Sequence, residues 1–172
     1  SGDQAYASHF TAADALLGDA LDDEDSRVRD EAFRTIWAWN SSAPQPALER
    51  ASHCRHADLR ERIVREASRL KSESWADALL LRLCQDGAGR VGLLAYKELL
   101  EVEENKTRAD VHAAALSSTA TETLVHACRH IDAASFGASR SRALDLVDDP
   151  RPQVHLAAIE CFDRHRASDE TA

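Results

Sequence analysis

Five stretches of the chain repeat one pattern, in which an apolar residue or Thr123 precedes a small or aliphatic anchor residue by four positions. The anchors are Ala32, Ile63, Ala95, Ala127 and Ala158, so successive anchors stand 31, 32, 32 and 31 residues apart. A constant period of roughly 20–50 residues is typical of stacked solenoid repeats. We therefore expect one repeat domain over residues 11–166, a capping lead-in at 1–10 and a frayed tail at 167–172.

Within each repeat the apolar positions have the period of an α-helix. We count offsets from the residue that stands four positions before each anchor. At about 100° per residue, offsets 0, +4 and +8 point to one side of the helix. We expect these positions to form the core: Val28, Ala32, Ile36, Leu59, Ile63, Ala67, Val91, Ala95, Leu99, Thr123, Ala127, Ile131, Val154, Ala158 and Phe162. No sustained period-2 alternation indicates a strand, so the predicted fold is all-α.

Prolines, glycines and polar turns separate the expected helices. The clearest break is the segment 41–46, which contains two prolines, because proline starts a helix well and continues one badly. The pattern predicts ten helices in five pairs, near residues 11–21, 26–40, 46–54, 57–70, 75–84, 90–103, 107–117, 121–132, 137–147 and 152–165.

Composition supports this assignment and narrows the class of protein. Of the 172 residues, 44% are apolar but only 5% aromatic, and the net charge is −9. Small aliphatic side chains suit closely packed helices, while the acidic balance argues against a general nucleic-acid or membrane-surface binder. No apolar run approaches the roughly 18 residues that a membrane span needs.

The cysteines and the start of the chain suggest its context. The four cysteines lack CxxC spacing, so we expect reduced, mostly buried thiols in a cytoplasmic protein. The chain begins at Ser1 and contains no methionine. We infer a processed protein or a piece of a longer one, so its partner is either a separate protein or another domain of a parent chain.

Two turns resemble those of a known repeat family. Asp149-Pro-Arg-Pro-Gln-Val154 is similar to the HEAT-repeat turn, and the stretch from Asp23 to Val28 fits the same pattern and is followed by Arg29. The short period resembles bacterial HEAT-like repeats, including the phycobilisome-lyase type. The resemblance implies a right-handed α-solenoid of about five helix pairs, whose second helices line a concave binding surface.

This sequence departs from the family pattern in the middle repeats. The family's turn aspartate is replaced by Cys54 and Ser118, and its arginine by Gly92, Leu124 and His155. We therefore expect the Asp–Arg ladder between consecutive turns to be incomplete.

Two rows on the second helices are candidate partner-binding residues. At offset +6 stand four cations, Arg34, Arg65, Lys97 and Arg129. At offset +2 of the last three repeats stand the apolar residues Leu93, Val125 and Leu156. Together with Tyr96 and Leu100 beside them, they form a candidate apolar strip. An exposed apolar patch typically marks an interaction site.

Each row also has a purely structural interpretation. Asp30 and Glu61 stand four residues before Arg34 and Arg65, as in ordinary surface ion pairs on helices. The apolar residues could equally be buried between neighbouring repeats.

Motifs for chemistry are weak. His126 and His130 have the i,i+4 spacing of helical metal ligands, but no HExxH motif or His-Glu dipeptide accompanies them, so we expect no metal and no cofactor. Trp37 and Trp39 are two residues apart and cannot share a helix face, so we expect one packed and one partly exposed. No nucleophile elbow, P-loop or dinucleotide fingerprint is present, which favours a protein that is not an enzyme.

These observations favour a protein–protein interaction scaffold or adaptor. The alternative is a nucleic-acid-binding protein similar to HEAT-like DNA glycosylases, in which the four cations and Trp37 contact DNA. The net charge and the acidic runs at 22–25 and 101–104 argue against it, because phosphate affinity comes mainly from excess cations. Similarity to bilin lyases rests on the repeat type alone.

Overall fold

The computed structural model describes residues 13–101 and 105–169, and it places no described residue in a strand. The chain divides into two compact units, an N-terminal unit (Ser1–Arg69) and a C-terminal unit (Leu70–Ala172). The predicted all-α class is therefore confirmed for these residues. The expected lead-in at 1–10 and the end of the expected tail lie outside them.

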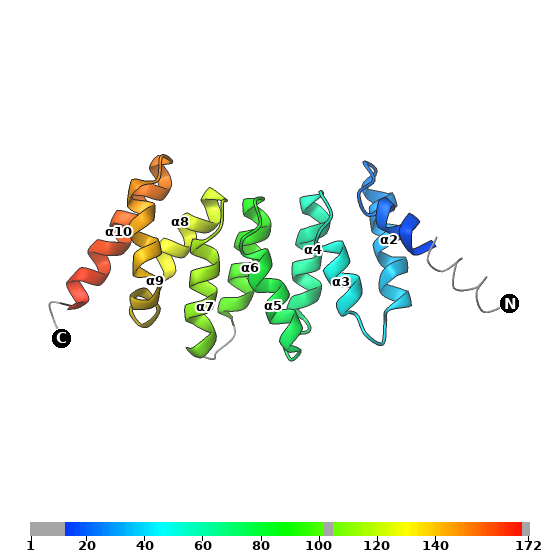
Figure 1. Cartoon of the computed structure of the whole chain (residues 1–172), viewed down its shortest axis with the longest axis horizontal. Coiled ribbons are helices and arrows are strands. Elements are labelled where there is room, and N and C mark those ends of the chain that lie inside the picture. The colour runs from blue at the N-terminus through cyan, green and yellow to red at the C-terminus, as the bar shows by residue number, and fades with distance from the viewer. Residues whose placement is uncertain (1–12, 102–104, 170–172) are drawn as a thin grey trace. The chain divides into compact units, whose positions relative to one another are not determined.

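The N-terminal unit holds a helix over 13–20, followed by α2 (Ser26–Trp39), α3 (Gln45–Ala51) and α4 (Ala57–Ser68) (Figure 1). Asp25 caps α2 by accepting a hydrogen bond from the Arg27 backbone N–H. A proline in the first turn of α3 removes a donor that would have no partner there. The break predicted at 41–46 thus separates α2 from α3.

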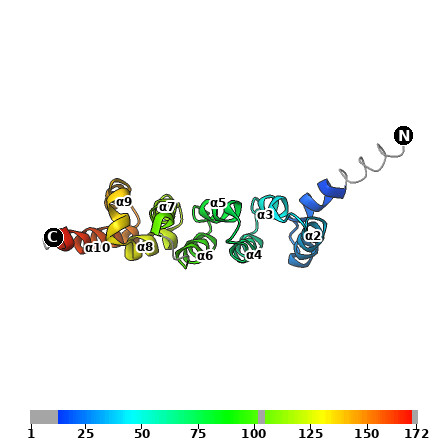
Figure 2. The ribbon, with the colours of Figure 1, turned by 90° about the horizontal axis from the view of Figure 1, so that it is seen from below.

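The described residues of the C-terminal unit form three helix pairs. They are α5 (Ser74–Leu83), α6 (Gly89–Leu100), α7 (Asn105–Leu116), α8 (Thr121–His130), α9 (Ala133–Asp145) with the 3₁₀ turn η1 (Leu146–Asp148), and α10 (Pro152–Asp169). Within this unit α7 packs against α5 and α9, and α8 packs against α6 and α10. The first helices form one layer and the second helices another (Figure 2).

The largest boundary differences from the prediction in this unit are at the start of α9 and the end of α10. Helix α9 begins at Ala133 rather than near 137, because the Asp132 side chain accepts the Ser135 backbone N–H and caps it. Helix α10 continues to Asp169, so the backbone of the expected frayed tail is helical over 167–169.

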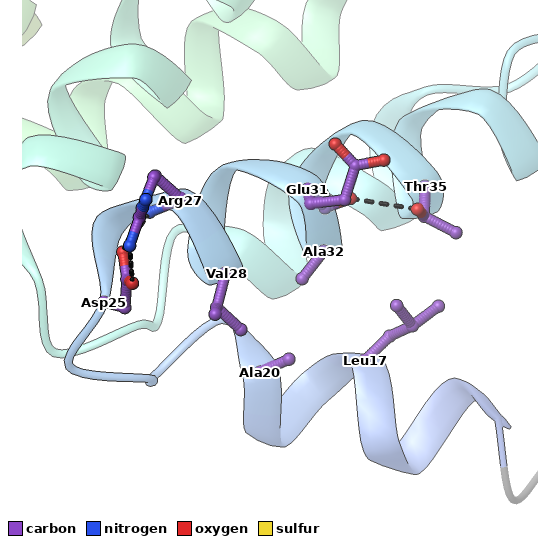
Figure 3. A pocket seen from close by; sticks show the side chains of 8 residues that line it. All are labelled: Leu17, Ala20, Asp25, Arg27, Val28, Glu31, Ala32 and Thr35. Atoms are coloured by element: carbon purple, nitrogen blue, oxygen red, sulfur yellow. Dashed lines mark hydrogen bonds and ion pairs between the residues drawn. The ribbon is translucent and has the colours of Figure 1, made fainter.

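The offset rule identified the core with two exceptions. Thirteen of the fifteen predicted positions are buried, Phe162 is half-buried, and Val28 is 41% exposed. Val28 was wrongly assigned, because among the described residues the short helix over 13–20 covers this side of α2 and leaves an open groove (Figure 3).

The arginines at the turns donate hydrogen bonds to backbone carbonyl oxygens and do not form a regular Asp–Arg ladder. Arg29 and Arg60 donate to the carbonyl oxygens of Asp23 and Cys54, each at 2.7 Å. Arg29 also reaches Oδ2 of Asp58 at 2.5 Å, although Asp58 is not the family's aspartate position. At the equivalent position Gly92 leaves no room for a side chain, since an added Cβ would lie 2.9 Å from the Cys84 carbonyl oxygen.

Candidate functional site

The solvent-facing side of α6, α8 and α10 carries the apolar row predicted at offset +2. Leu156 is 53% exposed, while Leu93 and Val125 are half-buried. Because α8 packs against both α6 and α10, the three residues stand on adjacent helices of the second layer. We call them the apolar row.

Tyr96 was wrongly placed in the exposed strip. Its side chain is fully buried, and its Oη lies 2.8 Å from Nδ1 of His112 on α7. The ring also meets the His126 ring edge-on, with 5.7 Å between centroids. Offset +5 therefore points between α7 and α8 rather than to solvent. Leu100 is half-buried.

The four predicted cations are exposed, and each arginine lies near a carboxylate. Arg34 pairs with Glu31 at 3.5 Å, Arg65 with Glu61 at 3.3 Å and Arg129 with Glu160 at 3.7 Å. The expected pair of Asp30 with Arg34 does not form, because Asp30 accepts a hydrogen bond from Arg62 on α4. Arg34 and Arg65 belong to the N-terminal unit, and Lys97 and Arg129 to the C-terminal unit.

A polar cluster on α6, α7 and the end of α8 is centred on the buried pair Tyr96 and His112. Nε2 of His112 faces the Asp132 carboxylate at 3.9 Å, and Arg108 lies at the same distance from that oxygen. Burial lowers the pKa of His112, although Asp132 opposes the shift. Burial also raises the pKa of Tyr96. The hydrogen-bonded pair is thus neutral near pH 7.

The histidine pair noted for its spacing forms the open edge of this cluster. The His126 and His130 rings are 4.1 Å apart between centroids and inclined at 33°. Burial, followed by His130, Lys97 and Arg129, lowers the pKa of His126 to about 4. Within the described ranges, no three His, Cys, Asp or Glu side chains gather closely enough to hold a metal ion.

A second surface feature is a groove of about 620 Å³ in the N-terminal unit. Leu17 and Ala20 line one wall, and Val28 and Ala32 line the other (Figure 3). The Asp25–Arg27 ion pair stands at its rim. The groove is mainly apolar, and Glu31 and Thr35 of α2 also line it.

The tryptophans and cysteines follow the predictions. Trp39 is 51% exposed, whereas Trp37 is half-buried with its ring 5.8 Å from that of Phe33. All four cysteines are buried and free. In the described part of the chain, no helix combines the length and apolar character that crossing a bilayer requires.

Sequence reasoning did not find His112 and Asp132. A signal was present, because His112 stands within the run Val111-His-Ala-Ala-Ala-Leu116, where a lone polar residue amid apolar ones is expected to find a buried partner.

Comparison with known proteins does not assign the chain to a family. No family model matches the chain, and no curated protein or solved structure matches it.

Proposed function

We propose that this chain is a protein-interaction module, built as an α-solenoid of HEAT-like helix pairs, that binds a segment of a partner protein on its second helices. In the C-terminal unit this surface is the outer side of α6, α8 and α10, which carries the apolar row. Repeat scaffolds of this kind present extended binding surfaces.

Contacts at the spacing of one repeat support the solenoid. Within the N-terminal unit Arg62 reaches Asp30, 32 residues away. Within the C-terminal unit Arg151 donates to the Thr119 carbonyl, 32 residues away, and His165 lies against the Ile131 carbonyl, 34 residues away. In both units, contacts thus join groups about one repeat apart, which supports stacked repeats.

The observation that carries the binding proposal is the exposure of Leu156 beside Val125 and Leu93. An apolar row on adjacent helices leaves surface that a partner's side chains would remove from water. Lys97 and Arg129 stand four residues after Leu93 and Val125 on the same helices. The surface therefore combines apolar contact with positive charge.

The DNA-binding alternative is less well supported. Of the four cations, Arg34, Arg65 and Arg129 each lie within 4 Å of a carboxylate. A phosphate would have to displace these carboxylates, and the net charge of −9 opposes its approach.

A display library of random 15-residue peptides, selected on the intact chain, tests the proposal. We expect enriched peptides whose affinity falls at least about tenfold with Leu156→Asp. Leu144→Asp is the matched control, because Leu144 is 58% exposed on α9 in the other layer. Failure to enrich peptides, or an equal loss with both variants, would overturn the proposal, as would salt-sensitive binding of short DNA that Leu156→Asp leaves unchanged.

A further inference from the structure

Four nitrogen-bearing side chains gather at the edge of the apolar row. Lys97 lies in the last turn of α6, and Arg129 and His130 lie in the last turn of α8. His126 is one turn earlier on α8, with its ring against that of His130. Helices α6 and α8 pack directly against each other, so these side chains flank one surface.

Two cations stand beside the histidine pair. The His126 and His130 rings are in contact. Burial lowers the pKa of His126, and Lys97 and Arg129 lie close enough to His126 to lower it further. Asp132 accepts the Ser135 N–H, whereas Glu160 lies 3.7 Å from Arg129, so a carboxylate that binds here competes with Glu160 for that guanidinium. The polar groups on helices packed against α8 include Tyr96 on α6, His112 and Arg108 on α7, and Arg164 on α10, which donates to the Arg129 carbonyl.

We propose that His126, His130, Lys97 and Arg129 form a binding site for an acidic side chain, Asp or Glu, of the partner segment. This inference rests on the proposed function and adds the chemistry of the partner. The apolar row would hold an apolar side chain of the segment, and the histidine edge would hold a carboxylate about one helical turn away.

Binding at this site is coupled to proton uptake. The His126 imidazole, in contact with His130 and beside two permanent cations, resists protonation, whereas a bound carboxylate favours it. The carboxylate therefore recruits a proton to His126. By linkage, affinity rises as the pH falls, by up to about tenfold per pH unit, which is the limit for uptake of one proton.

The test uses the intact chain and acetyl-(Glu)4-amide as the probe, with acetyl-(Gln)4-amide as the uncharged control. Histidine ring signals followed by NMR give the pKa of His126 with and without each peptide. We expect the Glu peptide to raise that pKa and to bind more tightly at pH 6 than at pH 7, and the Gln peptide to do neither. Lys97→Gln should weaken binding about two- to fivefold, while Arg140→Gln, an exposed cation on α9, should not change it.

The outcomes separate this inference from the proposed function. If library peptides bind through Leu156 but the Glu peptide leaves His126 unchanged, the acidic site is refuted and the interaction surface stands. If the Glu peptide binds but no library peptide depends on Leu156, the interaction surface fails instead. Binding of zinc chloride to the histidine pair that the Glu peptide does not displace would assign the pair to a metal and also refute the acidic site.

Discussion

The buried contact between Tyr96 and His112 gives the sharpest prediction for stability. Tyr96 is 0% and His112 is 1% exposed, and Oη and Nδ1 are 2.8 Å apart. Because the Asp132 carboxylate faces Nε2, the neutral tautomer with its proton on Nε2 is favoured, and the tyrosine hydroxyl then donates to Nδ1.

Tyr96→Phe removes this donor while keeping the ring in place. Nδ1 of His112 is then left without its partner in a buried site, which costs about 1–3 kcal/mol. Since both groups are neutral, we expect a value in the lower half of that range. In the Tyr96→Phe, His112→Leu double variant, the cost should be at least about 1 kcal/mol less than the sum of the single costs.

Urea unfolding provides the measurement. Fluorescence of Trp75 in α5 reports on the C-terminal unit when Trp37 and Trp39 are replaced by phenylalanine. Ser117→Ala is the matched control, because it removes an exposed hydroxyl that bonds to a backbone carbonyl, and we expect a change below about 0.5 kcal/mol. A Tyr96→Phe cost no larger than that of the control, or additive single costs, would refute the buried hydrogen bond.

Three further predictions follow from packing and burial. Gly92→Ala should lower the free energy of unfolding by about 1–3 kcal/mol, because the new methyl group would push against a backbone carbonyl and a threonine hydroxyl. Gly137→Ala, whose methyl group would meet nothing within 4 Å, should instead stabilise α9 by about 0.5–1 kcal/mol in the same urea assay. A similar effect at both sites would contradict this packing. Lowering the pH from 6.5 towards 4 should destabilise the C-terminal unit, because the unfolded chain binds more protons than the folded chain in that window. The contribution of His126 to this loss of unfolding free energy is at most about 3.4 kcal/mol, and solvent screening reduces it to roughly 1–2 kcal/mol. This contribution should be largely absent in His126→Gln. Burial raises the pKa of Cys84 and Cys128 to about 12, so iodoacetamide at pH 8 should modify these thiols only after unfolding, and rapid labelling of the native chain would show that they are accessible.

The sequence was most informative where one periodicity determined burial. Positions such as Ile63, Ala95 and Val154 were correctly placed in the core, because a 3.6-residue period identifies the inner side of a helix. The prediction for Val28 was wrong, because burial also depends on which helix covers that side of α2, and the offset pattern holds no information on the neighbouring helix.

The candidate site was harder to predict, because offset +5 lies between the inner and outer sides of a helix. Tyr96 reaches a partner on α7, 16 residues away, and only tertiary packing decides whether such a ring turns inward. Tertiary packing also decides the ion pairs, since Asp30 pairs with Arg62 on another helix and not with Arg34 on its own helix. For Leu156 the sequence left exposure and burial both open, and the side chain is exposed because it stands opposite the buried Val154 and Ala158.

Intermolecular NOEs to methyl groups test the central claim most directly. The intact chain, labelled with ¹³C at its leucine and valine methyls, would be mixed with an unlabelled peptide selected from the display library. We expect NOEs from the peptide to Leu93, Val125 and Leu156 on α6, α8 and α10, and none to Leu144 on α9. NOEs confined to Leu144 or to the groove residues Leu17 and Val28 would show that the partner binds elsewhere.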